Sequence, residues 1–120
     1  MKRILIADDA LFMRMMLKDL LTRNGFNVVG EAENGEEVVE QYRELKPDIV
    51  LIDILMPSLD GLSAMEQIIG EYPSARVVMI SAMGQKAYVE RAIELGAKDF
   101  ITKPFSPPKV IEILQNIVEN

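Results

Sequence analysis

The 120 residues suffice to bury one hydrophobic core, and 49% hydrophobic with 27% charged residues is an ordinary composition for a globular domain. A net charge of −6 argues against nucleic acid or an anionic membrane as a partner, and no apolar run nears the roughly 20 residues that cross a bilayer. His and Cys are both absent, which excludes zinc sites built on those ligands, Ser-His-Asp triads and Cys-His nucleophiles.

The missing residue types also narrow the chemistry that remains. Any nucleophile must be an Asp, Glu, Ser, Thr, Tyr or Lys side chain, and any metal site must use oxygen ligands, which favours Mg²⁺, Mn²⁺ or Ca²⁺. Without Cys no disulfide forms, and Met1-Lys2-Arg3 leads straight into a strand-like segment rather than a signal peptide. We therefore expect a cytoplasmic protein with a single domain over residues 1–120.

The first predicted strand, residues 4–7, ends at Asp8-Asp9. The helix after it has apolar residues at i, i+3, i+4, i+7 and i+8 and ends at Asn24-Gly25. The predicted core residues of this helix are Met13, Met16, Leu17, Leu20 and Leu21. Three more apolar residues lie off that stripe, either as a docking face, which we favour slightly, or as further packing: Leu11, Phe12 and Met15.

A weaker strand, residues 28–32, is expected at an edge of the sheet, and Asn34-Gly35 leads into a helix that stops before Pro47. Residues 49–53 then form the most apolar strand, four consecutive apolar residues that end in Asp53. After Asp60-Gly61 a further amphipathic helix runs up to Pro73.

The remaining elements repeat the alternation. Residues 77–81 predict a strand that ends in a serine, and a helix from about 85 to 95 follows, with its cap at Gly96 and Val89, Ala92 and Ile93 facing inward. Residues 99–102 predict a fifth strand, and prolines open the last helix. Its inward residues are expected to be Val110, Ile111, Leu114, Ile117 and Val118.

Strict alternation of strand and helix with short connections predicts an α/β fold, a flavodoxin-like (βα)5 doubly wound parallel sheet with strand order 2-1-3-4-5. In such a sheet the ligand crevice lies beyond the carboxyl ends of the strands, at the switch point between the first and third strands. Those two strands are the ones that end in Asp8-Asp9 and in Asp53.

Polar side chains end four of the predicted strands and should meet at one rim: Asp8, Asp9, Asp53, Ser81 and Lys103. Clustered carboxylates repel one another unless a cation lies among them, and oxygen-only ligands suit Mg²⁺. An ammonium and a hydroxyl would then meet a phosphoryl group, and a carboxylate nucleophile would form an acyl phosphate. Each residue taken alone is equally consistent with a solvated strand end.

On these residues the chain resembles the receiver domain of two-component response regulators, close to the stand-alone chemotaxis (CheY-type) regulators. The matching motifs span essentially the whole chain: Asp8-Asp9, Asp53 with Met56-Pro57 and Asp60-Gly61, Ser81-Ala82 and Lys103-Pro104-Phe105. Three further segments support the chemotaxis type, namely residues 10–16, 81–85 and 96–100.

The resemblance implies that Asp53 is the phospho-acceptor, served by a histidine kinase, and that the chain catalyses only its own phosphorylation and dephosphorylation. It also implies the other roles of the site: Asp9, Asp53 and the carbonyl of Leu55 as Mg²⁺ ligands, Asp8 acting through a water, Lys103 and Ser81 on the phosphoryl group, Phe100 as the aromatic switch and a cis bond before Pro104.

The implied partners are a CheA-type histidine kinase, a flagellar-motor switch protein or another target, and a phosphatase. The docking face would be built from the fourth helix, fifth strand and fifth helix. Two features depart from many relatives. Phe100 replaces a tyrosine, and an apolar pair, Leu55 and Met83, flanks the path of the hydrolytic water. We therefore expect a comparatively long-lived phospho-Asp53.

Other readings of the same residues remain. A haloacid-dehalogenase-type phosphatase would need a second acid two residues after Asp53, where this chain has Leu55. A receiver-fold interaction module that works without phosphorylation is the main alternative, although clustering acids, a lysine and a hydroxyl without a ligand is costly. A flavin-binding domain would need a phosphate-cradling loop where this chain has acids, and a DNA-binding regulator would need an effector domain after the last helix.

Overall fold

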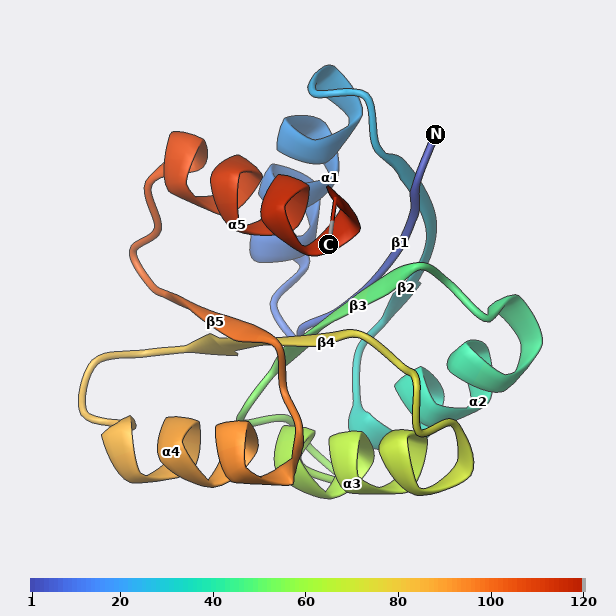
Figure 1. Cartoon of the computed structure of the whole chain (residues 1–120). Coiled ribbons are helices and arrows are strands. Elements are labelled where there is room, and N and C mark those ends of the chain that lie inside the picture. Colours follow the sequence, from blue (N-terminus) through green and yellow to red (C-terminus); the bar gives the residue numbers. More distant parts are fainter. Residues whose placement is uncertain (120) are drawn as a thin grey trace.

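A computed structural model describes residues 1–119, in which strands and helices alternate from end to end (Figure 1). The strands are β1 (Arg3–Ala7), β2 (Asn27–Ala32), β3 (Ile49–Asp53), β4 (Val77–Ser81) and β5 (Asp99–Thr102). The helices are α1 (Leu11–Arg23), α2 (Gly35–Leu45), α3 (Gly61–Glu71), α4 (Lys86–Leu95) and α5 (Pro107–Glu119).

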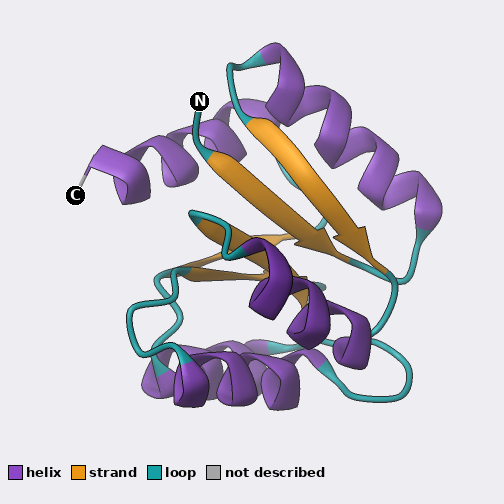
Figure 2. Ribbon diagram, turned by 90° about the vertical axis from the view of Figure 1, so that its right-hand side faces the viewer, coloured by secondary structure: helices purple, strands orange, loops and turns teal. Residues whose placement is uncertain are grey.

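The strands form one parallel sheet in the order β2-β1-β3-β4-β5, so the predicted topology is confirmed and β2 lies at an edge. Figure 2 shows the sheet enclosed between two layers of helices. Because every strand runs the same way, all five carboxyl ends meet at one rim of the sheet. Every residue of the central strand β3 is buried, as its unbroken apolar run predicts.

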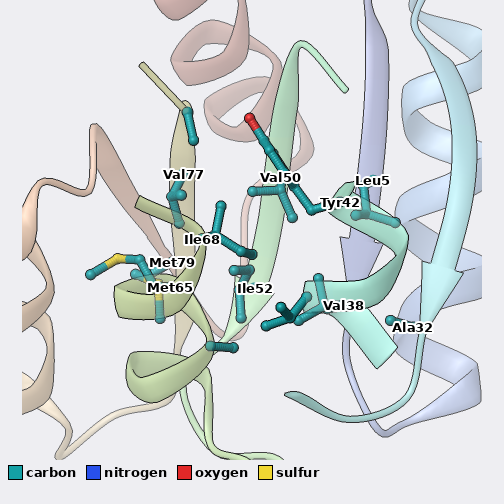
Figure 3. Packing of buried hydrophobic residues seen from close by; sticks show 14 of the residues in the cluster. Leu5, Ala32, Val38, Tyr42, Val50, Ile52, Met65, Ile68, Val77 and Met79 are labelled. Atoms are coloured by element: carbon teal, nitrogen blue, oxygen red, sulfur yellow. The ribbon is translucent and has the colours of Figure 1, made fainter. Parts of the chain in front are cut away.

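Successive strand residues supply two separate cores, since side chains alternate between the faces of a sheet. On the face covered by α2, α3 and α4, Val50 and Ile52 of β3 pack with Tyr42, Met65 and Ile68 (Figure 3). On the face covered by α1 and α5 the buried set includes Ile4, Ile6, Ile49, Leu51, Leu17, Leu21, Val110 and Leu114. These two cores hold the strands in place, and with them the residues at the carboxyl ends of the strands.

Side-chain caps begin two of the helices. The side chain of Asn34 accepts a hydrogen bond from the Glu37 amide at the start of α2, and that of Asp60 accepts one from the Ser63 amide at the start of α3. At the other end of α4, Gly96 has φ 114°, a left-handed conformation that glycine adopts without strain. The turn signals in the sequence therefore mark real helix ends.

Two apolar residues that the periodicity assigned to the core lie outside it. Met16 of α1 is 42% exposed, because the buried line of that helix runs through Arg14, Leu17 and Leu21. Ile93 of α4 is 45% exposed, since that helix buries only Ala92 fully. In α5 the buried set includes Ile113, which the stripe omitted. Within residues 1–119, no helix has the length and apolar character that crossing a membrane requires.

Candidate functional site

The carboxyl ends of β1, β3 and β5 bring two acids and one lysine into direct contact. The ammonium Nζ of Lys103 donates to Oδ2 of Asp8 and to Oδ2 of Asp53, each at 3.0 Å. The Asp8 side chain is fully buried and that of Asp53 is 11% exposed, whereas Lys103 is 23% exposed. One cation thus bridges two nearly buried carboxylates that are far apart in the sequence.

The second oxygen of each carboxylate is held by the backbone of its own loop. Oδ1 of Asp8 accepts from the Ala10 amide at 2.9 Å, and Oδ1 of Asp53 accepts from the Leu55 amide at 3.2 Å. Both carboxylates are therefore held at two points, by Lys103 and by a backbone amide of the following loop.

Gly61 allows the loop after Asp53 to close tightly. Its amide donates to the Ile54 carbonyl at 2.8 Å. A Cβ at this position would overlap the backbone carbonyl oxygen of Asp53. The turn signal Asp60-Gly61 is thus needed for a close approach of backbone to backbone beside the candidate nucleophile.

Burial and charge pull the pKa values at this site in opposite directions. Burial raises the pKa of Asp53, and the neighbouring Asp8 charge raises it further, while the hydrogen bond from Lys103 lowers it; the net pKa lies above the ordinary value. Burial lowers the pKa of Lys103, but hydrogen bonds to Asp8 and Asp53 outweigh it and the pKa is raised. The lysine is therefore held in its charged form.

A third acid, Asp9, completes a group that suits a divalent cation. Carboxylate oxygens of Asp8, Asp9 and Asp53 all lie within 4.8 Å of one another, and Asp9 is exposed while the other two are buried. Three carboxylates against the one ammonium of Lys103 leave two negative charges, which a divalent ion would neutralise. An all-oxygen donor set with an open side fits Mg²⁺, which keeps several of its waters.

Ser81 ends β4 on the far side of the site and faces β5. Its hydroxyl lies 3.5 Å from the Ile101 carbonyl and 3.4 Å from the Thr102 hydroxyl, and the residue is 2% exposed. Phe100 of β5 is 40% exposed. A cavity of about 200 Å³ lies between the loop after β4 and β5, and its lining includes Ser81, Val89 and Phe100. The Lys103–Pro104 peptide bond is cis, the form that the resemblance implies.

The strand-end residues thus fall into two groups. The acids Asp8, Asp9 and Asp53 lie together with Lys103, whereas the hydrogen bonds of Ser81 run to β5. The sequence patterns did not predict a role for Arg14. This residue is buried on α1 and donates a hydrogen bond to the backbone carbonyl of Asp8 at 2.7 Å. Its spacing of three and seven residues from Leu17 and Leu21 was the available signal, since it places a charged residue on the buried line.

Comparison with known proteins identifies the family of this chain. Residues 4–115 match the family described as response regulator receiver domain. The chain is 56% identical to the chemotaxis protein CheY of Thermotoga maritima over 116 residues, 97% of each chain. It is 55% identical to the chemotaxis protein CheY of Bacillus subtilis over 112 residues, 93% of each chain.

Solved structures of similar proteins share the fold. The chain resembles the crystal structure of the CheX–CheY–BeF3–Mg²⁺ complex of Borrelia burgdorferi with a TM-score of 0.93 and 37% identity, covering 98% of this chain and 89% of that one. It also resembles the response regulator domain of Thermotoga maritima CheB, with a TM-score of 0.88, 40% identity and coverage of 97% and 96%.

Proposed function

The chain belongs to the response regulator receiver domains, of the CheY chemotaxis type, and on this premise we propose that it accepts a phosphoryl group on Asp53. The observation that carries the proposal is the shared ammonium of Lys103, 3.0 Å from both Asp53 and Asp8. A carboxylate held at a strand end beside a cation and further acids is suited to attack an anionic phosphoryl donor. We take residues 1–120 as one receiver domain that acts in the cytoplasm.

This chain contains no histidine, so it cannot be the phosphohistidine donor itself, and we propose that the physiological donor is a phosphohistidine on another protein. A carboxylate oxygen of Asp53 forms the new O–P bond while the P–N bond to the donor imidazole breaks. The electron pair of that bond remains on the imidazole nitrogen, which takes up a proton, and Asp53 becomes an acyl phosphate. We propose a CheA-type histidine kinase as the donor protein.

Side chains of the site divide the work around Asp53. Asp9, Asp53 and the carbonyl of Leu55 would hold Mg²⁺, with Asp8 acting through a water. Bound Mg²⁺ would supply positive charge to the phosphoryl oxygens. Lys103, which pairs with Asp53 before transfer, would pair with the phosphoryl oxygens afterwards, because formation of the acyl phosphate removes the carboxylate charge that Lys103 balances.

Output would follow from a change at Ser81 and Phe100. In the structure the Ser81 hydroxyl is engaged with β5 and Phe100 is partly exposed beside the cavity of about 200 Å³. A phosphoryl group on Asp53 offers the hydroxyl a charged acceptor, so the loop after β4 would move toward Asp53 and Phe100 would turn inward. The altered face of α4, β5 and α5 would then bind a flagellar-motor switch protein or another target.

No separate substrate is turned over in this scheme. The chain catalyses only the gain and loss of its own phosphoryl group, and a partner phosphatase would shorten the lifetime of the acyl phosphate. Residue 55 is leucine, so the acid that an Asp-nucleophile phosphatase needs two positions after Asp53 is missing from the sequence.

Incubation with Mg²⁺ and acetyl phosphate tests the proposal, with intact-mass measurement as the readout. We expect one added phosphoryl group on the wild-type chain, none on Asp53→Asn and an undiminished adduct on the exposed control Asp60→Asn. Chelation of Mg²⁺ should abolish the adduct. An unmodified wild-type chain under these conditions would favour an interaction module that works without phosphorylation.

A further inference from the structure

Four polar or charged residues are buried within residues 1–119, and one of them has no part in the proposed chemistry. Asp8, Asp53 and Ser81 belong to the site already described, whereas Arg14 lies on the buried line of α1 and is 5% exposed. A guanidinium is expensive to bury unless its N–H groups are all directed at acceptors. The contacts of Arg14 therefore indicate what its burial is for.

The guanidinium connects the acidic loop to the end of β2. Nη1 of Arg14 donates to the backbone carbonyl of Asp8 at 2.7 Å. Nε donates to Oε1 of Glu31 at 3.2 Å, and Nη2 donates to Oε1 of Glu33 at 3.4 Å. The two glutamates fix the plane of the guanidinium, so that its shortest bond points at a single carbonyl oxygen.

That carbonyl oxygen belongs to the peptide plane between Asp8 and Asp9. On the other side of the residue, the Asp8 amide donates to the Ala32 carbonyl at 3.0 Å, so the backbone of Asp8 is held from both sides. Because a peptide unit is planar, fixing the carbonyl of Asp8 also fixes the direction in which Asp9 continues the chain. Asp9 itself is exposed, so we expect its orientation to depend on the peptide plane that precedes it.

We propose that Arg14 is a positioning residue that orients the Asp8-Asp9 pair for a divalent cation. The inference rests on the proposed function, since it assigns the acids to Mg²⁺. Arg14 touches neither the ion nor the phosphoryl group; it acts through the peptide plane of Asp8. Groups that orient metal ligands in this way typically change metal affinity by roughly 10–100-fold when they are removed.

The test compares Mg²⁺ binding by calorimetry in wild type, Arg14→Met and Arg14→Lys. We expect Arg14→Met to weaken Mg²⁺ binding by roughly tenfold or more. Arg14→Lys should show a smaller loss, because an ammonium can reach the Asp8 carbonyl but cannot form the fork to both glutamates. In metal-free protein, hydrogen exchange of the Ala10 amide, which donates to Asp8 Oδ1, should be faster in Arg14→Met.

The matched control is Leu17→Ala, a buried residue of the same helix in the α1 core. It should lower stability but leave the Mg²⁺ affinity and the exchange of the Ala10 amide relative to the rest of the chain unchanged. Folded Arg14→Met with wild-type Mg²⁺ affinity would overturn the role of Arg14 alone, as would an equal loss in Leu17→Ala. If Arg14→Met does not fold, Arg14→Lys is the test variant, and wild-type Mg²⁺ affinity in that variant would overturn the role of Arg14. A wild-type chain that binds no Mg²⁺ overturns both proposals.

Discussion

Asp8 and Asp53 each place an Oδ2 atom 3.0 Å from the same ammonium, that of Lys103. Burial and the neighbouring Asp8 charge raise the pKa of Asp53, and Lys103 is the one cation that offsets them among the described contacts. The Lys103 side chain therefore contributes both to the stability of the fold and to the charge balance of the candidate site.

Replacing Lys103 should therefore lower the stability of the fold. Lys103→Met leaves two neighbouring carboxylates without their cation, and we expect a loss of unfolding free energy in urea titrations with a chelator present. The loss should fall below the roughly 3–5 kcal/mol of a fully buried broken pair, because Lys103 is 23% exposed. Lys109→Met, whose side chain is 64% exposed, should change stability by less than about 0.5 kcal/mol. Equal losses in the two variants would contradict this contribution of Lys103.

Mg²⁺ should stabilise the wild-type chain by mass action. At a concentration about 100 times the dissociation constant, a ligand that binds only the folded state adds about 2.7 kcal/mol to the unfolding free energy. Asp9→Asn should lose most of this gain, whereas its metal-free stability should not fall, because Asp9 is exposed and its charge repels those of Asp8 and Asp53. Asp19→Asn, an exposed acid on α1, should keep the full gain in the same urea titrations. A full Mg²⁺ gain in Asp9→Asn would remove this residue from the ligand set.

Two glycines of α3, Gly61 and Gly70, should respond in opposite directions to replacement by alanine. Gly61→Ala forces a methyl group against the Asp53 carbonyl oxygen, and we expect a cost of roughly 1–3 kcal/mol together with slower phosphorylation by acetyl phosphate. Gly70→Ala meets no heavy atom within 4 Å and should stabilise the helix by roughly 0.5–1 kcal/mol. Thermal unfolding and adduct formation measure both effects, and an unimpaired Gly61→Ala would contradict the close approach.

The ion pair between α2 and α3 should give a small acid-sensitive contribution to stability. Hydrogen bonds from Arg43 lower the pKa of Glu71, so the folded state binds its proton less tightly than the unfolded state. This contribution is present above the pKa of Glu71 in the unfolded chain, near the ordinary glutamate value of 4.5, and is lost as the pH falls through the lower pKa of the folded state. We expect the difference between wild type and Glu71→Gln in urea titrations to vanish in acid and to shrink in high salt, since the pair is exposed. A difference that grows in acid would contradict the assignment.

We expect the apolar side chains of Leu55 and Met83, two positions after Asp53 and Ser81, to set the lifetime of phospho-Asp53. Leu55 and Met83 are 52% and 83% exposed, and neither can orient water by hydrogen bonding. Leu55→Asn and Met83→Glu should each shorten the half-life of the acyl phosphate several-fold, measured by loss of the mass adduct after the donor is removed. Met16→Gln, also on an exposed surface, should leave the half-life unchanged. Rapid unassisted loss from wild type would contradict the expected long lifetime.

Strand order and the strand-end acids are predictable from the sequence because they follow from short-range patterns. An unbroken apolar run marks β3 as doubly covered, and parallel topology then brings Asp8 and Asp53 to one rim. The partner of an individual side chain is harder to predict. The hydrophobic periodicity correctly predicted that Leu17 and Leu21 are buried. It also predicted a buried Met16, whereas in the structure Arg14 is the third buried residue of α1.

The reason is that apolar periodicity counts only hydrophobic residues. A buried arginine satisfied by Glu31, Glu33 and a backbone carbonyl has no apolar signature, and its partners are up to 19 positions away. For Ile93 the error is the opposite one, since the periodicity predicted burial and α4 buries only one of its residues fully. Long-range polar contacts, and how deeply a helix packs at the edge of the sheet, can be read only from the folded structure.

The order of residues along the chain has a consequence for biosynthesis. Lys103 comes 95 positions after Asp8 and 50 after Asp53, at the end of the last strand of the sheet. During translation the acids of β1 and β3 are therefore complete long before the ammonium that neutralises them has been made. A nascent or truncated chain that ends before β5 would hold the acids without their lysine. Such an incomplete product would lack both hydrogen bonds that Lys103 donates to the carboxylates of Asp8 and Asp53.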